Sequence, residues 1–394
     1  MIVFAELFMT GGQHVPFNAA MLAAFREALP MQTIEVHTSK QHFEQMYELQ
    51  SNTSAILLHQ KRVVPDKIGS KQTWLKKFVN EAIQLFRVLK RAKRQQADLV
   101  YFTFLSPFGQ LLVYYYIKIC RYKRPVWITL HGLEILKKEK QQKAIDRLYA
   151  ACLRYAFGKV LPNRKYMVLE ATVIDYLIVH QLLQPQVIFY IPHPYIFKHA
   201  VHVSDTTDEP IVFAHFGSAR LDKNSALFFE LAFHFRAAVY AGKVRFDVIG
   251  PVLPEMQHAI HPWVNLVATT SPLPRHAYEQ ACMRAHYAVF CYQANQYELT
   301  SSGAVLDAIA YSKPIFALRS SIFQYLFSIT VEPPGQLFDD AEALRQGIQS
   351  IIDQPHHLVA DYQATFLALQ KYHSIPRIAS LLKTAMHQQT IPGS

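Results

Sequence analysis

The stretch that decides the fold runs from residue 99 to residue 130, LVYFTFLSPFGQLLVYYYIKICRYKRPVWITL. It begins with the apolar run Leu99–Phe104 and ends with the apolar run Val126–Leu130, and a helix starting near Phe108 is predicted between them. Short apolar runs joined by a helix are typical of parallel strands whose sheet is covered on both faces. The stretch therefore predicts a βαβ unit.

The same alternation continues towards the N-terminus and beyond residue 130. Further strands are predicted at Ile2–Leu7, Thr33–Thr38, Ala55–Gln60, Gly158–Leu161 and Val187–Ile191. Further helices are predicted to start near Phe17, Gln41, Thr73, Glu139 and Tyr166. A repeated βα rhythm of this kind indicates an α/β domain built on a mostly parallel sheet.

The polar segment Phe197–Pro210 shows neither helical nor strand periodicity, and we take it as the domain boundary. The rhythm then restarts, with strands predicted at Ile211–Phe216, Arg245–Ile249, Leu266–Ala268, Ala288–Tyr292, Pro314–Ala317 and Ile329–Val331. With 394 residues, two Rossmann-like domains are expected, 1–200 and 201–374, facing each other across a cleft. The final helix, 375–394, could return to the first domain. Ligands in such sheets bind beyond the carboxyl ends of the strands.

Composition excludes several classes of protein. With 51% hydrophobic and 13% aromatic residues, the chain is not disordered as a whole. The four cysteines lack metal-ligand spacing, which favours buried thiols and a reducing, cytoplasmic compartment: Cys120, Cys152, Cys282 and Cys291. The N-terminus MIVFAELFMTGG begins as a strand and does not resemble a signal peptide. No apolar run reaches the roughly 18–20 residues that span a bilayer.

The net charge of +11 is concentrated in part in Trp74–Arg94, WLKKFVNEAIQLFRVLKRAKR. A basic helix with apolar residues among its charges can lie on an anionic membrane surface, here the inner face of the cytoplasmic membrane. The alternative is a helix packed on the first sheet with a solvated basic face. Nucleic acid is not expected as a partner, because no nucleic-acid-binding motif accompanies the charge.

The segment Phe216–Asn224, FGSARLDKN, follows the first strand of the second domain. Gly217 and Ser218 allow a tight turn, and Arg220 and Lys223 place two cations beside a helix start. Backbone amides and the helix dipole favour an anion there, so the segment predicts a site for a diphosphate. The alternative is a surface turn with solvated charges.

A second segment, Tyr297–Ala317, also starts a helix. Thr300, Ser301 and Ser302 supply an N-cap, and Gly303 permits close approach of a ligand to the backbone. Asp307 lies one turn inside the helix, where a carboxylate can accept hydrogen bonds from both ribose hydroxyls. The alternative is a capped core helix with a solvent-facing aspartate.

These motifs resemble those of the retaining GT-B glycosyltransferases of the family 4-like group. GSARLDKN is similar to the family's G-x-x-R-P-Y-K-G loop, and the run from Cys291 to Ile315 to its later P-Y-…-S-G-x-x-x-E-A-x-A-x-G-x-P-V segment. Asp247–Gly250 resembles the family's strand ending in glycine, Ile191–Pro194 its I-P-H-G boundary strand, and Thr129–Gly132 its T-x-H-[GD] strand end. The resemblance covers most of residues 127–317 and implies the GT-B fold.

The resemblance also implies roles for individual residues. Arg220 and Lys223 would hold the diphosphate of a nucleoside diphosphate sugar, with amide donors from Ser302 and Gly303. Asp307 stands where the family binds the ribose, and His131 where its histidine meets the donor sugar. Gly11-Gly12 is the candidate for the first-domain glycine loop, with His14 and Asn18 beyond it. Neither a cofactor nor a metal ion is expected, because the two cations can neutralise the leaving diphosphate.

The sequence departs from the family at the position of its first glutamate, which is Leu299 here. Either the loop is shifted to present Glu298, one residue away, in its place, or this sugar-contacting carboxylate is absent. The predicted function is transfer of a sugar to a saccharide or lipid-linked acceptor in bacterial surface polysaccharide or lipopolysaccharide assembly. Retaining chemistry would need no enzymic base; an inverting enzyme would need one, and His14 or Glu6 are the candidates. The alternatives are a sugar-nucleotide epimerase, a phosphorylase, or a non-catalytic GT-B module that binds a saccharide or a partner glycosyltransferase.

Overall fold

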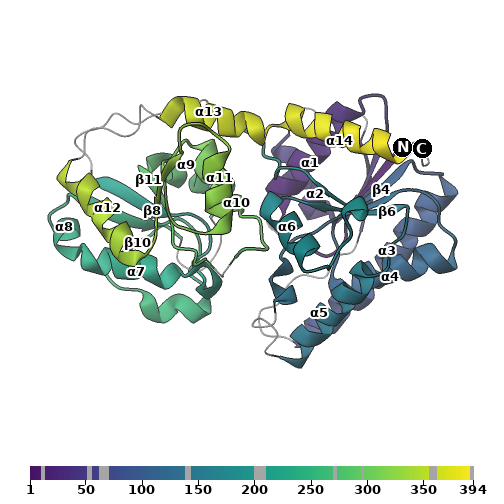
Figure 1. Ribbon diagram of the computed structural model, residues 1–394, viewed down its shortest axis with the longest axis horizontal. Helices are drawn as coiled ribbons and strands as arrows, with labels where there is room; N and C mark the ends of the chain where they lie inside the picture. The colour runs from purple at the N-terminus through teal and green to yellow at the C-terminus, as the bar shows by residue number, and fades with distance from the viewer. Residues whose placement is uncertain are drawn as a thin grey trace. The chain divides into compact units, whose positions relative to one another are not determined.

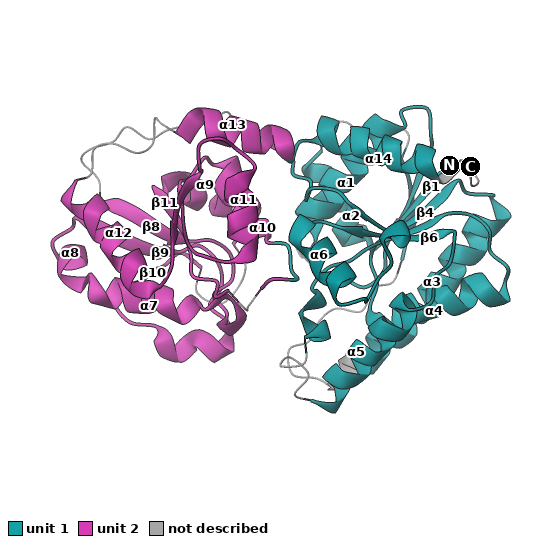
Figure 2. Cartoon of the chain, viewed as in Figure 1, with its two compact units in different colours: residues 1–196, 299–301, 373–394 teal, residues 197–298, 302–372 magenta. Residues whose placement is uncertain are grey.

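The protein is described by a computed structural model in which residues 1–9, 14–50, 56–61, 71–137, 143–198, 210–268, 273–294, 297–354 and 362–390 are placed. The chain forms two compact units, drawn in two colours in Figure 2. Unit 1 comprises residues 1–196, 299–301 and 373–394, and unit 2 comprises residues 197–298 and 302–372. The chain passes from unit 1 to unit 2 after Ile196, and the last helix belongs to unit 1.

Unit 1 contains a seven-stranded parallel sheet in the order β3-β2-β1-β4-β5-β6-β7. Its strands are β1 Ile2–Glu6, β2 Ile34–Thr38, β3 Ile56–Gln60, β4 Leu99–Phe104, β5 Val126–Thr129, β6 Arg164–Val168 and β7 Ile188–Tyr190. Side chains of β1 alternate between two apolar clusters, with Val3 in one and Phe4 in the other. Both faces of the sheet are therefore covered, as the continuous apolar runs predicted.

The helices of unit 1 divide between these two faces (Figure 1). One face packs against α3 Lys71–Arg94, α4 Pro107–Ile119, α5 Ala144–Phe157 and α6 Ala171–Val179. The other packs against α1 Val15–Ala28, α2 Lys40–Glu48 and α14 Ile375–Thr390. The last helix lies against the first one through buried Ile378 and Leu382, so the two ends of the chain share one core.

Unit 2 contains a six-stranded parallel sheet in the order β10-β9-β8-β11-β12-β13. Its strands are β8 Ile211–His215, β9 Val244–Val248, β10 Asn265–Leu266, β11 Tyr287–Phe290, β12 Ile315–Leu318 and β13 Gly335–Phe338. Its helices are α7 Ser225–His234, α8 Arg236–Tyr240, α9 Arg275–Arg284, α10 Gly303–Ala310, α11 Ser321–Ser328, α12 Ala341–Asp353 and α13 Gln363–Tyr372. Both units thus have the strand order of a doubly wound Rossmann fold. The order reverses between β1 and β4 in unit 1 and between β8 and β11 in unit 2.

The predicted strand Gly158–Leu161 is wrong. Gly158 ends α5, and the strand of this region is β6, where a helix was expected to start near Tyr166. The misleading residue is Arg164, a charged side chain at the start of a central strand. Its guanidinium is buried and donates to the carbonyl oxygens of Ala156, at 2.7 Å, and Lys159, at 2.5 Å. Those partners make a buried arginine tolerable.

The predicted strand Ile329–Val331 is also wrong. Ile329 ends α11, and Val331 is 99% exposed. The last strand is β13, which begins at Gly335 and pairs with β12. A Cβ atom at Gly335 would lie 2.1 Å from the carbonyl oxygen of Ile315, so only glycine allows the two strands to approach this closely.

Two predicted features lie outside the described residues. They are the glycine loop Gly11-Gly12 and the helix start near Glu139. Within the described chain, none of the helices combines the length and the apolarity that a membrane span requires. The run from Phe108 to Cys120 lies in α4, which connects β4 to β5 as a crossover helix.

Candidate functional site

The loop after β8 forms a tight turn against the neighbouring strand connection. Gly217 has a φ of +78°, and a Cβ atom on Gly250 would lie 2.2 Å from the carbonyl carbon of Gly217. Glycine is therefore needed at 250 for the backbones to touch, and glycine is favoured at 217 by its left-handed conformation. Ser218 lies in the same turn, between Gly217 and the bridge that joins Ala219 to Val252.

Lys223 is the buried cation of this loop. Its side chain is 7% exposed, and its ammonium lies 5.9 Å from the ring centroid of Tyr292 and 5.7 Å from that of Tyr297. Burial, reinforced by the charge of Arg220, lowers the pKa of Lys223 to about 8. The charges of Asp222 and Asp307 act in the opposite direction on this pKa, but among the described residues neither carboxylate forms an ion pair with the Lys223 ammonium within 4 Å. A buried ammonium without a carboxylate partner is costly and favours an anionic ligand.

Arg220 is placed differently from Lys223. It lies at the start of the same loop, about 40% exposed, and its guanidinium pairs with Asp222. Both predicted cations lie in the loop after β8, but Arg220 already has an anionic partner, Asp222. A diphosphate would have to compete with Asp222 for it.

The start of α10 lies beside this loop. A Cβ atom on Gly217 would lie 3.4 Å from the Lys223 ammonium and 3.5 Å from the Cβ atom of Ala304. Ser302 occupies the N-cap position, but its hydroxyl does not cap the helix as predicted. Instead it hydrogen-bonds to the hydroxyl of Tyr292 at 3.0 Å. Among the described residues, no atom outside the local chain lies within 4 Å of a Cβ atom on Gly303, so its backbone is open to a ligand.

Asp307 does not face solvent. It is 8% exposed, accepts a hydrogen bond of 2.8 Å from the Tyr278 hydroxyl, and lies 3.7 Å from the Arg275 guanidinium. The carboxylate is thus held in place by two side chains of α9. A carboxylate has about four lone-pair sites, so the Asp307 oxygens can still accept hydrogen bonds from ribose hydroxyls in addition to these two contacts.

Three residues just before α10 belong to unit 1, namely 299–301. Leu299 is 2% exposed and lies in an apolar cluster of that unit, and its amide donates to Glu134 Oε1 at 2.6 Å. The Ser301 hydroxyl hydrogen-bonds to Glu170, whose pKa is raised to about 8 by burial. Ser301 therefore belongs to unit 1, whereas Ser302 and Gly303 belong to unit 2. Glu298, the candidate replacement for the family glutamate, is half-buried in unit 2.

Three histidines gather at the carboxyl edge of the sheet of unit 1. The ring centroid of His131, which follows β5, lies 4.4 Å from that of His14 and 4.8 Å from that of Phe17. Phe17 also contacts His193, with centroids 5.2 Å apart. Burial and the charges of His14 and His193 hold the pKa of His131 well below its usual range. His131 is therefore a neutral imidazole at pH 7, suited to hydrogen bonding.

Glu6 is not suited to act as a base. Its carboxylate is buried and accepts hydrogen bonds from the amides of Phe8 and Met9 and from the side chains of Asn18 and Thr103. Burial raises its pKa, but the nearby His14 and His42 and the Met9 amide outweigh that effect and lower the pKa to about 2. These contacts and the lowered pKa disfavour Glu6 as the base of an inverting enzyme, because the group orders the loop after β1.

Several residues that shape the site were missed by the sequence analysis. Ser225 Oγ accepts from the Arg220 amide and pairs with His215 Nε2, both at 2.9 Å. The Asn224 amide group donates to the Cys291 carbonyl at 3.0 Å. These contacts tie the loop after β8 to its own strand and to β11. A serine at the start of a helix is a detectable signal, whereas the partner of Asn224 is not.

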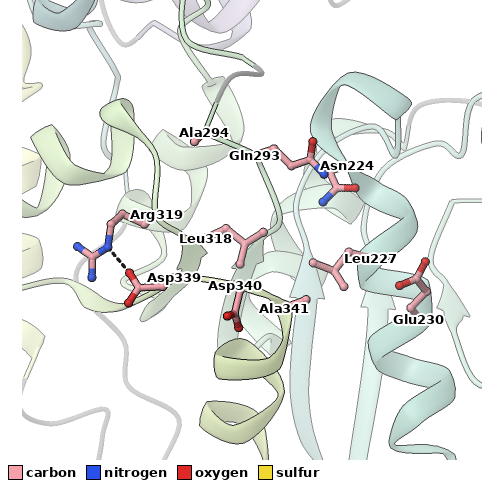
Figure 3. A pocket seen from close by; sticks show the side chains of 10 residues that line it. All are labelled: Asn224, Leu227, Glu230, Gln293, Ala294, Leu318, Arg319, Asp339, Asp340 and Ala341. Carbon is pink, nitrogen blue, oxygen red and sulfur yellow. Dashed lines mark hydrogen bonds and ion pairs between the residues drawn. The ribbon is translucent and has the colours of Figure 1, made fainter.

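A polar pocket of about 470 Å³ lies at the carboxyl edge of unit 2 (Figure 3). Its volume is within the usual range of small-molecule sites. Asn224 belongs to both the pocket and the loop after β8, while Arg319 and Asp339 form an ion pair of 2.5 Å at its rim. The sequence analysis did not single out this pocket, because its lining comes from four separate strand ends.

No protein-family model matches the chain, and no curated protein matches its sequence. Its fold is similar to that of several solved structures. HepE from Anabaena, solved with UDP and glucose, is 13% identical over 99% of both chains, with a TM-score of 0.66. Sucrose-phosphate synthase from Thermosynechococcus elongatus is 14% identical over 98% of both chains, with a TM-score of 0.68. The lipopolysaccharide outer core galactosyltransferase WaaB is 13% identical over 98% of this chain and 99% of its own, with a TM-score of 0.63. The chain therefore has the α/β fold of the GT-B glycosyltransferases, as expected.

Proposed function

We propose that the protein is a glycosyltransferase that moves a sugar from a nucleoside diphosphate sugar to a saccharide or lipid-linked acceptor. The observation that carries the proposal is the buried Lys223, without a carboxylate within 4 Å among the described residues, beside Gly217 and the start of α10. This group of residues lies where the strand order of unit 2 reverses, between β8 and β11. Ligands of doubly wound sheets bind at that position.

In the proposed reaction, the bond between the anomeric carbon and the diphosphate oxygen breaks, and its electron pair stays with the diphosphate. The acceptor hydroxyl oxygen forms the new bond to the anomeric carbon. Lys223, Arg220 and the amides at Ser302 and Gly303 would stabilise the charge that develops on the leaving group. The proposal assigns this role to cations of the protein rather than to a metal ion. If the configuration is retained, the diphosphate can accept the acceptor's proton.

Within this proposal Asp307 binds the ribose, held in position by Tyr278 and Arg275. His131 meets the donor sugar as a neutral hydrogen-bonding group, with the ring of His14 against it. The complexes of HepE with UDP, with UDP and glucose, and with UDP-glucose make UDP the first nucleotide to test. WaaB is named a lipopolysaccharide outer core galactosyltransferase, which supports a lipopolysaccharide acceptor. We extend the proposal to other bacterial surface polysaccharides and place the reaction in the cytoplasm.

A thermal-shift panel of UDP, GDP, ADP, CMP and TDP tests the donor site. At about 100 times its dissociation constant, a ligand stabilises the native state by about 2.7 kcal/mol. We expect one nucleotide to raise the melting temperature of the wild type, and this rise to be lost in Arg220→Ala/Lys223→Ala. A wild type that responds to none of the five, in a folded sample, would contradict the proposal.

Leu299 favours a second candidate, a non-catalytic GT-B module that binds a saccharide or a partner glycosyltransferase. It occupies the place of the family's first glutamate, and its side chain is buried in an apolar cluster. Incubation of the matching sugar nucleotide with saccharide acceptors separates the two, because only the transferase releases the nucleoside diphosphate with formation of a glycoside. The same sugar nucleotide without acceptor would reveal an epimerase by its conversion to an epimer.

A further inference from the structure

The outer face of α3 carries an apolar stripe that the core does not need. Leu75, Val79, Ile83 and Phe86 are 60%, 52%, 45% and 42% exposed. Their spacing of four, four and three residues places them on one side of the helix. Another side of the helix supplies Leu85, Val88, Leu89 and Ala92 to the core, and the Phe86 ring also packs against Tyr116, with centroids 5.8 Å apart. Contiguous exposed apolar side chains of this kind mark interaction surfaces.

The edge strand of the sheet lies beside this helix and is apolar as well. β3 is an edge strand of the sheet of unit 1, and its Leu57, which lies on the same face of the sheet as His59, is 54% exposed. Arg91 of α3 contacts His59 of β3 at 3.2 Å, which fixes the strand next to the helix. One exposed apolar side chain of the edge strand therefore lies on the same face of the sheet as α3.

The same part of unit 1 is strongly cationic. The sequence of α3 contains eight lysines and arginines and one carboxylate, Glu81, which is buried. The exposed cations Lys118, Arg121, Lys123 and Arg124 lie close to the end of α3. Lys93 donates to the Cys120 carbonyl at 2.7 Å, and Arg124 to Gln96 at 3.4 Å, which brings the two groups of cations together. Cations beside an apolar stripe match an anionic lipid surface, since a nucleic acid would use the charges alone.

We propose that the outer face of α3 is a docking surface for an anionic lipid bilayer. The four apolar side chains of the stripe enter the interface, and the cations near the C-terminal end of α3 contact the lipid headgroups. Lysine and arginine side chains reach headgroups while their stems stay on apolar surface. The α3 helix lies with α4 and α5 on one side of unit 1 (Figure 1).

The inner side of α3 connects this surface with the histidines at the sheet edge. The Phe78 ring lies 5.6 Å from that of Phe8, which lies 5.5 Å from that of Phe104. Phe104 in turn lies 5.7 Å from His14 and 6.3 Å from His131. This row of partly exposed rings gives the apolar part of a lipid-linked acceptor a path from the bilayer to the histidines; this last step rests on the proposed function.

Sedimentation of the full chain with vesicles tests the docking surface. We expect at least tenfold stronger binding to vesicles of phosphatidylcholine with 30% phosphatidylglycerol than to phosphatidylcholine alone, weakening with salt. Val79→Glu/Ile83→Glu should reduce this binding at least tenfold. The matched control is Val331→Glu/Leu367→Glu, at positions 99% and 51% exposed in unit 2, which should bind as the wild type does.

Two outcomes would overturn the docking surface. One is a wild type that does not bind anionic vesicles, and the other is an equal loss in both double variants. Binding of heparin distinguishes charge from apolar contact, because Val79→Glu/Ile83→Glu should weaken heparin binding far less than vesicle binding. An unchanged melting temperature and nucleotide response in this variant show that fold and donor site are intact, so that failure here is separate from failure of the proposed function.

Discussion

The ammonium of Lys223 lies 3.4 Å from the point that a Cβ atom on Gly217 would occupy, and the φ of Gly217 is +78°. Glycine at 217 therefore serves both the left-handed backbone and the space for the cation. Because Lys223 reaches the turn from a position six residues later, the loop folds back on itself and presents its charge beside backbone amides. Such an arrangement suits an anion that contacts both.

Gly217→Ala should destabilise the protein by about 1 kcal/mol, because an L-residue is strained in the left-handed region. Its methyl group would lie 3.4 Å from the Lys223 ammonium, at van der Waals contact, and should weaken nucleotide binding by occupying space beside the cation. Urea unfolding and the nucleotide thermal shift measure the two effects. Gly242→Ala is the control, since Gly242 has a φ of +68° and no atom of the described chain lies within 4 Å of the added Cβ. It should lose similar stability and keep nucleotide binding; equal loss of binding in both would contradict the assignment.

Affinity for a nucleoside diphosphate should fall as the pH rises through about 8, where Lys223 loses its proton. The folded-state pKa of Lys223 lies below the ordinary lysine value of about 10.4, so the unfolded chain holds the extra proton between these pH values. Stability of the free protein should therefore rise with pH across this window. Lys223→Met should flatten both dependences, as titration calorimetry and urea unfolding from pH 7 to 10.5 would reveal. A wild-type affinity independent of pH from 7 to 9.5 would argue against contact with Lys223.

Glu81→Gln should stabilise the protein at pH 8 and have less effect at pH 5.5. Burial raises the pKa of Glu81 to about 7, although the Ser106 amide and hydroxyl donate to the carboxylate. The folded state binds the proton between the ordinary value of about 4.3 and 7, so stability falls as the pH rises through this window. Glutamine removes that loss, up to about 3.5 kcal/mol for a shift of this size. Urea unfolding at both pH values is the measurement, and an equal effect at the two would contradict the raised pKa.

Leu299→Glu should not create the family's missing glutamate. The side chain lies in an apolar cluster of unit 1, where an unpaired carboxylate should cost about 3 kcal/mol or more. Thermal and urea unfolding should show this loss, with Val331→Glu as the exposed control. A stable Leu299→Glu protein that binds the sugar nucleotide more tightly would instead place residue 299 at the donor.

The sequence by itself determined the fold class and the loops that matter. Apolar runs such as Leu99–Phe104 and the helices between them are local signals, and their alternation allows few arrangements other than doubly wound sheets. The loop from Gly217 to Lys223 was predicted because it directly follows a strand, and the helix start at Ser302 because N-cap residues and a glycine precede a helical stretch. Their juxtaposition follows from the strand order, which places β8 beside β11.

Only the tertiary structure decided which of these side chains already have partners within the protein. The burial of Lys223 against Tyr292, the pairing of Arg220 with Asp222 and the enclosure of Glu6 depend on partners whose arrangement in space a linear pattern does not reveal. The same holds for Leu299, whose neighbours Leu133 and Glu134 are some 165 positions away in the chain. Periodicity records which face of an element is apolar, whereas a side chain's charge state and hydrogen bonds are set by whatever the fold brings against it.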